Sequence, residues 1–258
     1  MKPINTLLTI LFISLLSSPS WSVTLGDLVK RDGLYYEKFT DVPFTGEVTG
    51  DKQGSFKDGK RDGAWVTYHE NGQLWSKGNY KNGKWNGAWV YYHDHGQLWS
   101  KGNYKNGKKE GTWVDYQGMA GSKGNYRNGK LEGAWAEYWN NGQLSSQGNY
   151  KNGNKEGAWV DYWSDGQLIT KGSYKNGKKE GAWVAYTRDG RVFYVLTGTY
   201  KNDEKEGTWV YYHDNGQLES KGNYRNGKKD GTWVAYQREG TVWEFLTGTY
   251  KDGKKISD

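Results

Sequence analysis

Apolar and polar residues alternate in short runs along almost the whole chain, and Asn-Gly or Asp-Gly pairs separate the runs. The first clear example has one run over residues 64–69, the pair Asn71-Gly72 and a second run over residues 73–81. Alternation with a period of two is typical of β-strands. Asn-Gly between two such runs indicates a tight hairpin turn in which both residues take a positive φ. None of the runs has the i, i+3, i+4 spacing of an amphipathic helix, so the pattern predicts an all-β chain of successive hairpins.

A tryptophan marks the centre of each hairpin and recurs every 22–26 residues. A fixed period of roughly 20–50 residues indicates an array of stacked repeats. We assign residues 63–255 to eight repeats of about 24 residues and residues 23–62 to an N-terminal capping segment, because terminal units of arrays are atypical. The prediction is an elongated, single antiparallel meander of stacked β-hairpins with about 16–20 strands. The eight tryptophans are Trp65, Trp89, Trp113, Trp135, Trp159, Trp183, Trp209 and Trp233.

The turn geometry predicts which residues face each other across a hairpin. A two-residue turn at residues 71–72 would pair His69 with Leu74 and would place Trp65 opposite Gly78. The glycine leaves room for the indole ring, so we expect the tryptophans to form a buried ladder on one face of the sheet. A bulge at the turn would change this register.

Three repeats differ in length from the others by two residues: the third is shorter, and the sixth and eighth are longer. Because a strand has a period of two, a change of two residues keeps each following side chain on its own face, whereas a change of one would move it to the other. The length changes therefore favour the strand assignment.

One frame of residues carries a resemblance to a known family. Tyr-x-Asn-Gly-x-x-x-Gly-x-Trp-x-x-Tyr, as in residues 104–116, and Gly-Gln-Leu, as in residues 96–98, recur through about residues 44–255. This pattern resembles the MORN repeat in its bacterial variant form, which includes antitoxin-like repeat proteins. The resemblance implies one hairpin per repeat in an elongated sheet, and a scaffold that binds proteins or, in some members, lipids.

The N-terminal residues predict export. Lys2 precedes a mainly apolar segment of ten residues at 7–16, too short to span a bilayer, and Ser20 and Ser22 offer small side chains at a cleavage site. We therefore assign residues 1–22 to a signal peptide, the alternative being a hydrophobic N-terminal strand. The chain has no cysteine for disulfides or for a lipid anchor, and its mean hydropathy of -1.02 excludes a bundle of membrane-spanning helices. We expect a periplasmic or secreted protein without a transmembrane segment after signal cleavage.

The sequence offers no catalytic constellation, and we expect a protein that is not an enzyme and needs no cofactor. His69, His93 and His213 share one position in their repeats, but equivalent positions lie about 9.6 Å apart, too far for one metal ion. Acidic residues recur just before seven of the eight tryptophans at a spacing close to that of the carboxylates in inverting glycosidases. No pair among them is distinguished, and we expect a solvated, salt-bridged edge. These acids are Asp62, Glu110, Glu132, Glu156, Glu180, Glu206 and Asp230.

Aromatic residues outside the repeat frame are candidates for binding. Trp75 and Trp99 occupy a variable position, and the expected register places them beside Lys77 and Lys101, away from the tryptophan ladder. Trp85 is expected in the turn that follows. Exposed aromatic rings beside lysines can form a contact patch, although local packing by large side chains is the alternative. With three turn lysines, the candidate binding residues are Trp75, Lys77, Trp85, Trp99, Lys101, Lys105, Lys108 and Lys109.

The positive charge is concentrated in the turns of the Lys-Asn-Gly-Lys type. Their excess of lysine and arginine is larger than the net charge of the whole chain, +7, so the remainder is net negative. If the hairpins cross the long axis, these turns form one basic edge that attracts anions. The alternative is that the lysines only keep the edge soluble and prevent strand pairing.

These observations favour a scaffold that binds a protein partner or an anionic lipid or glycan of the cell envelope. Nucleic acid is not expected, because the chain offers no recognition helix for a groove. Two alternatives stay open: a module that binds carbohydrate or cell wall, and an antitoxin or exported immunity partner of a toxin.

Overall fold

The computed structural model describes residues 22–118, 120–192 and 197–258. Nearly all of the predicted signal peptide, residues 1–22, lies outside these ranges. A short 3-10 helix, η1 (Leu25–Asp27), precedes the strands. The strands are β1 (Leu28–Arg31), β2 (Leu34–Glu37), β3 (Gly46–Val48), β4 (Lys52–Lys57), β5 (Lys60–Tyr68), β6 (Leu74–Lys81), β7 (Lys84–Tyr92), β8 (Leu98–Lys105), β9 (Lys108–Gln117), β10 (Ala120–Arg127), β11 (Lys130–Tyr138), β12 (Leu144–Lys151), β13 (Asn154–Tyr162), β14 (Leu168–Lys175), β15 (Lys178–Ala185), β16 (Gly198–Lys201), β17 (Glu204–Tyr212), β18 (Leu218–Arg225), β19 (Lys228–Ala235), β20 (Gly248–Lys251) and β21 (Lys254–Ser257).

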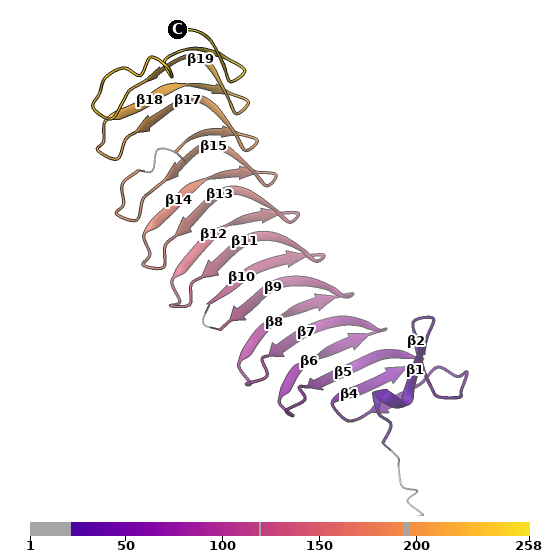
Figure 1. Ribbon diagram of the computed structural model, residues 1–258. Coiled ribbons are helices and arrows are strands. Elements are labelled where there is room, and N and C mark those ends of the chain that lie inside the picture. The colour runs from indigo at the N-terminus through magenta and orange to yellow at the C-terminus, as the bar shows by residue number, and fades with distance from the viewer. Residues whose placement is uncertain (1–21, 119, 193–196) are drawn as a thin grey trace, which may run out of the picture.

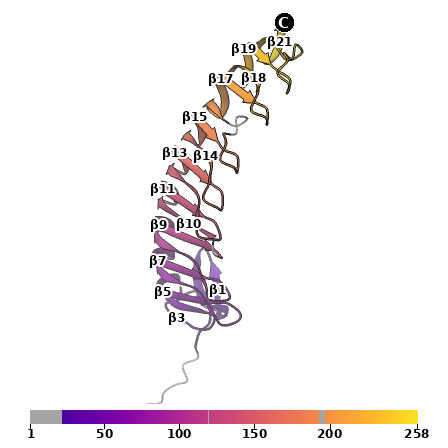
Figure 2. The ribbon, with the colours of Figure 1, turned by 90° about the vertical axis from the view of Figure 1, so that its left-hand side faces the viewer.

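The described strands β3 to β21 form a single-layer antiparallel meander in which each strand pairs with its neighbours in the sequence. The strands cross the long axis of a gently curved, elongated molecule (Figures 1 and 2). Strands β3 and β21 lie at opposite ends, as Figure 2 shows. The prediction of an elongated array of stacked hairpins is confirmed.

The turns on one side of the sheet have the predicted two-residue geometry. Between β6 and β7, Lys81 pairs with Lys84, and Asn82 and Gly83 both take positive φ values, 50° and 77°. Gly83 N–H donates to the carbonyl of Arg61 in the preceding hairpin at 2.8 Å. Successive turns are therefore stacked by backbone hydrogen bonds, and we call this side the tight-turn edge.

The turns on the other side differ from the prediction. Tyr68, not His69, pairs with Leu74, and only Gly72 in this turn takes a positive φ, 82°. His69 N–H donates to the Gln73 carbonyl and Gly72 N–H to the His69 carbonyl, as in a three-residue turn with a bulge. We call this side the loop edge. Its turns are residues 69–73, 93–97, 139–143, 163–167, 187–191, 213–217 and 237–241, and the shortened turn after Gln117.

The tryptophans pack on glycines of the neighbouring strand. Trp65 pairs with Gly78 in register, as predicted, but its ring lies over Gly54 on its other side. In the next repeat the Trp89 ring lies over Gly78, where a Cβ atom would be 2.2 Å from indole Cδ2. Any side chain at Gly78 would therefore displace the ring.

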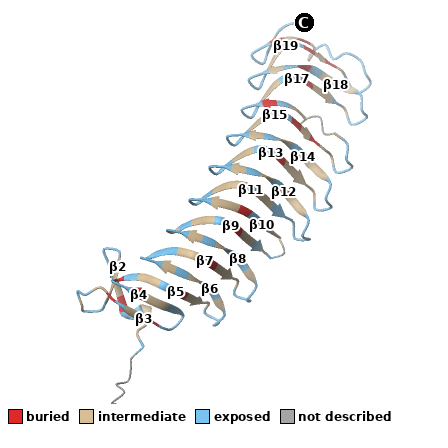
Figure 3. Ribbon diagram, turned by 180° about the vertical axis from the view of Figure 1, so that it is seen from behind, coloured by how far each residue is buried: buried red, intermediate tan, exposed pale blue. Residues whose placement is uncertain are grey.

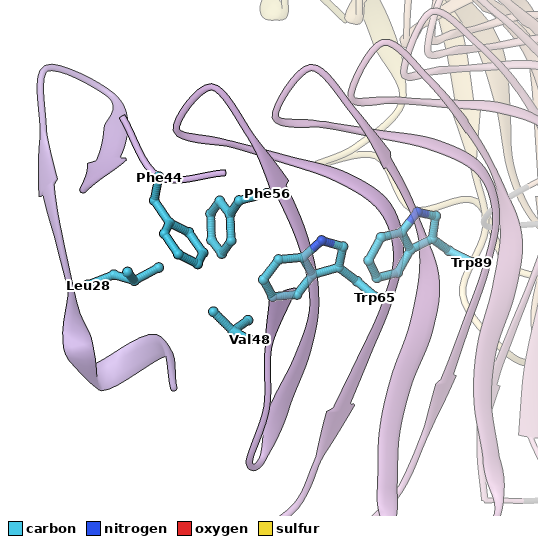
Figure 4. Close-up of a cluster of buried hydrophobic side chains, with 6 residues drawn as sticks. All are labelled: Leu28, Phe44, Val48, Phe56, Trp65 and Trp89. Atoms are coloured by element: carbon cyan, nitrogen blue, oxygen red, sulfur yellow. The ribbon is translucent and has the colours of Figure 1, made fainter. Parts of the chain in front are cut away.

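The ladder forms the core of the molecule. Seven of the eight tryptophans are only 1–4% exposed, and Trp135 is half-buried. Tyr80 stands edge-on between two of them, with ring centroids 5.7 Å from Trp65 and 5.2 Å from Trp89. At the N-terminal end Phe56 continues the ladder 5.2 Å from Trp65, as Figure 4 shows. Exposed residues are concentrated at the turns (Figure 3). We call this side of the sheet the Trp face.

The opposite side, the Val face, alternates small apolar and long polar residues. Val66 pairs with Lys77, and Lys77 pairs on its other side with Val90. The aligned members are Val66, Lys77, Val90, Lys101, Val114, Lys123, Ala136, Gln147, Val160, Lys171, Val184, Val210, Lys221 and Val234.

The changes of length in the third and eighth repeats fall at the loop edge, and that of the sixth includes residues 193–196, outside the described ranges. In the third repeat Gln117 pairs with Ala120, so the missing residues shorten the turn. In the eighth repeat the added residues form a turn in which Trp243 N–H donates to the Ala235 carbonyl, and the register resumes with Trp233 opposite Gly248. The strand assignment is confirmed, and the loops rather than the strands absorb the changes of length.

Candidate functional site

The tight-turn edge carries a row of cations. Each of the nine tight turns between the described strands β4 and β21 is flanked by two exposed residues that lie opposite each other. Sixteen of these eighteen residues are lysine or arginine, and the exceptions are Asn154 and Glu204. The pairs are Lys57–Lys60, Lys81–Lys84, Lys105–Lys108, Arg127–Lys130, Lys151–Asn154, Lys175–Lys178, Lys201–Glu204, Arg225–Lys228 and Lys251–Lys254.

These cations are almost entirely without anionic partners. In the described part of the chain only Arg225 among the sixteen forms an ion pair, with Asp230 at 3.3 Å. Like charges directly opposite each other destabilise a sheet, so the sequence keeps these pairs at a cost in stability. An unpaired row of this kind creates a positive field along the edge.

The neighbouring acids are occupied by the backbone instead. Glu110 Oε2 accepts a hydrogen bond of 2.8 Å from the N–H of Asn128, which has a positive φ in the next tight turn. The expected salt-bridged edge is therefore wrong for most of these acids, because each carboxylate holds the following turn. The matching pairs are Asp62–Asn82, Glu132–Asn152, Glu156–Asn176, Glu180–Asn202 and Glu206–Asn226.

Only two of the three predicted turn lysines belong to this row. Lys105 and Lys108 flank one tight turn and are exposed. Lys109 turns to the Trp face, where its Nζ lies 4.1 Å from the ring centroid of Trp113 and 5.0 Å from that of Tyr126. Strand alternation places this position on the Trp face, and the cation is attracted to the aromatic rings. Assigning Lys109 to the basic edge was therefore wrong.

The cation over the ring is a repeated feature that sequence analysis missed, although its place four residues before six of the eight tryptophans could have indicated it. Burial lowers the pKa of two of these amines, Lys205 and Lys229. The pairs, with 3.9–4.5 Å between the charge and the ring centroid, are Arg61–Trp65, Lys109–Trp113, Lys155–Trp159, Lys179–Trp183, Lys205–Trp209 and Lys229–Trp233.

The predicted patch of Trp75 and Trp99 beside Lys77 and Lys101 does not form. The Trp99 ring lies on the Trp face, 6.0 Å from Tyr91, which itself stacks on Trp89. Trp75 shares a hollow with Trp65 on the same face. The bulge at the loop edge shifts the alternation and moves both rings to this face.

Lys77 and Lys101 lie exposed on the Val face instead, where each pairs with valines. The lysines and the two tryptophans therefore occupy opposite sides of the sheet and cannot contact a ligand together.

Trp85 lies in β7 and not in the turn, in the position that lysine holds in most repeats. Its Nε1 donates to Tyr80 Oη at 2.8 Å, and the ring is 41% exposed. Beside it a hollow of about 410 Å³ is lined by the basic residues Lys30, Lys60, Arg61 and Lys84. This end of the basic edge therefore combines four cations with an aromatic ring.

The histidine position at the loop edge links successive repeats. His69 Nε2 lies 3.0 Å from the Tyr92 carbonyl, and Trp139 Nε1 donates to the Tyr162 carbonyl at 3.0 Å. His93 Nε2 and Trp163 Nε1 are buried without a hydrogen-bond partner in the described chain, and in both cases the following repeat has an altered length. Among the described residues no group of three or more His, Asp or Glu could hold a metal ion.

A model of the MORN repeat variant family matches five segments, residues 61–82, 85–106, 131–152, 155–176 and 205–226. These are the first, second, fourth, fifth and seventh repeats, so the unmatched repeats are the three with altered length. No curated protein matches the chain. In the part of the chain that the structure describes, no helix is long and apolar enough to cross a membrane.

Proposed function

We propose that this chain, which belongs to the MORN repeat family in its variant form, is an exported, non-enzymatic scaffold that binds a phosphate-bearing lipid surface of the cell envelope. The observation that carries this proposal is the row of unpaired cations on the tight-turn edge. Adjacent turns are two strands apart, about 9.6 Å, so the cations recur at a spacing that an extended anionic surface can meet.

The expected binding is weak at each turn and strong only in sum. A lysine or arginine near an anionic membrane contributes about 1 kcal/mol, and salt screens that attraction. The backbone hydrogen bonds that stack the turns hold the backbone positions of the cations in one row. The hollow beside Trp85 adds an aromatic ring at the N-terminal end of the row.

Co-sedimentation with vesicles tests the proposal. The protein should sediment with phosphatidylglycerol vesicles or with lipopolysaccharide at low salt, but not with phosphatidylcholine vesicles, and about 0.5 M salt should release it. Comparing sedimentation with phosphatidylglycerol vesicles and with lipopolysaccharide distinguishes these two sources of phosphate.

A pair of double variants with the same change of charge locates the site. Lys105→Glu with Lys108→Glu changes the tight-turn edge, whereas Lys77→Glu with Lys101→Glu changes the Val face, where the lysines are also exposed. Only the first should weaken sedimentation. Equal weakening by both would mean that net charge alone, and not the edge, attracts the protein.

Export is part of the proposal and is tested separately. Deletion of residues 1–22 should leave the protein in the cytoplasm. Intact-mass analysis of the exported form should show that its chain begins near Val23. An uncleaved N-terminus in the envelope fraction would contradict it.

A protein partner, including a toxin bound by an immunity protein, is the second candidate. The observation in its favour is a group of exposed apolar residues near the C-terminal end: Val242 is 44%, Trp243 40%, Phe245 78% and Ile256 63% exposed. Patches of this kind on soluble proteins mark contact sites. Phe245→Glu should abolish capture of such a partner from envelope extract without affecting vesicle binding.

A further inference from the structure

The shortened turn of the third repeat leaves a hollow at the loop edge, on the Trp face. The hollow has a volume of about 700 Å³, in the usual range of ligand sites. The hollow therefore lies at the edge of the sheet opposite the tight-turn edge. Its lining contains no lysine or arginine. The lining residues used below are Asp115, Ser122, Glu137, Trp139, Asn140 and Ser145.

Trp139 presents a fixed aromatic surface to this hollow. Its ring is 38% exposed, whereas Trp163, in the same position of the next repeat, follows a full-length turn and is half-buried. The hydrogen bond from Trp139 Nε1 to the Tyr162 carbonyl holds the orientation of the ring. The indole of Trp139 is therefore accessible from the hollow.

Polar groups around the ring are free to bind. Ser122 lies between two carboxylates, because it pairs with Asp115 on one side and with Glu137 on the other. Asp115 accepts a hydrogen bond from Ser100 through one oxygen only. Among the described residues, the side chains of Ser122, Glu137, Asn140 and Ser145 have no hydrogen-bond partner. In the second and seventh repeats a tyrosine occupies the position of these carboxylates, and its hydroxyl bonds to a second tyrosine.

We propose that the hollow binds a hexopyranose unit that carries a free amino group. The apolar C–H face of the sugar would lie on the Trp139 ring, and the carboxylates of Asp115 and Glu137 would accept hydrogen bonds from the ammonium group and neighbouring hydroxyls. A sugar acid would instead meet two uncompensated carboxylates and be repelled. This site differs from the tight-turn edge in place and in sign of charge, so it does not depend on the proposed function.

Titration of the protein with defined oligosaccharides tests the ligand class. Tryptophan fluorescence and calorimetry should detect binding of a glucosamine tetramer, binding about tenfold weaker for the N-acetylglucosamine tetramer, and none for a galacturonic acid tetramer. Equal or tighter binding of the galacturonic acid tetramer, or binding of none of the three, would overturn the proposal.

Three variants place the ligand in the hollow. Trp139→Ala should weaken binding of the glucosamine tetramer by about tenfold or more, and Trp99→Ala, which removes a tryptophan of similar exposure elsewhere on the Trp face, should not. Ser145→Trp should abolish binding by filling the hollow, and it should fold because Trp75 and Trp99 occupy the equivalent position in two repeats. Unchanged binding in Ser145→Trp, or an equal loss in Trp99→Ala, would exclude this site.

Glu137→Gln should reduce the preference for the amino sugar over its acetylated form, and an unchanged preference would overturn the role of the carboxylate.

Discussion

The Trp face and the Val face are built by the same strands, yet they contribute differently to the molecule. On the Trp face, Trp159 is 2% exposed, with the Lys155 Nζ 3.9 Å from its ring centroid. Its neighbour Val160 points to the other face, where it pairs with Gln147 and Lys171. Apart from the N-terminal end, where Leu28 and Tyr35 pack onto the ladder, no second layer of the described chain covers either face. The comparison shows how a single-layer sheet obtains a core: large rings on one face bury each other along the array, and the other face stays exposed.

The largest expected effect on the stability of the Trp face comes from alkaline pH. Burial raises the pKa of seven tyrosines on the Trp face above 10.0, and for Tyr91 and Tyr211 a hydrogen bond to a second tyrosine adds to the shift. Because the folded-state pKa exceeds the unfolded one, the stabilisation is complete below pH 10 and is lost as the pH rises above that value. The seven are Tyr91, Tyr104, Tyr126, Tyr150, Tyr174, Tyr200 and Tyr211.

Two lysines on the same face act in the opposite direction. Burial lowers the pKa of Lys205 and Lys229 below 10.5, so the cost of their charge is relieved as the pH rises toward that value. The tyrosines outnumber them, and urea midpoints should therefore fall steeply between pH about 10 and about 12, together with tyrosine ionisation at about 295 nm. A stability that stays constant to pH about 12 would contradict the burial of the tyrosine rings.

A substitution on each face gives the next largest difference. Trp159→Ala should reduce the free energy of unfolding by about 3–5 kcal/mol, because it removes a buried ring and leaves a cavity. Val160→Ala, the adjacent residue on the Val face, should cost about 1 kcal/mol or less. Denaturant melts of both variants measure the values, and similar losses would show that the two faces share the core equally.

Depth within the Trp face is tested by a second tryptophan. Trp75 is 39% exposed, so Trp75→Ala should cost less than Trp159→Ala although both rings lie on this face. The same melts decide this point. A loss equal to that of Trp159 would mean that position 75 belongs to the core.

The smallest expected effect separates two lysines. Lys109→Ala should lower the free energy of unfolding by about 1 kcal/mol, because the amine lies over Trp113 and Tyr126. Lys101→Ala on the Val face should change it by less than about 0.5 kcal/mol. If the two variants are equally stable, the ring contact of Lys109 contributes nothing measurable.

The sequence by itself determined the period, the hairpins, the pairing of Trp65 with Gly78 and the row of cations at the tight turns. These follow from local rules: alternation defines strands, and Asn-Gly with directly flanking strands defines a two-residue turn. It did not determine the face of Trp75 or the geometry at Asn71-Gly72. The same dipeptide forms a different turn there.

Only the tertiary structure decided these points, because they depend on bulges and on contacts between repeats. The bulge at the loop edge leaves Trp75 out of the register and moves it to the Trp face, while Lys77 and Gly78 beyond it keep their expected faces. The carboxylate of Glu110 leaves the lysines unpaired because it finds a backbone N–H in the next hairpin. The hollow beside Trp139 exists because one short turn stands next to a full-length one. The sequence of a single repeat does not contain this information, because each feature depends on neighbouring repeats that only stacking brings into contact.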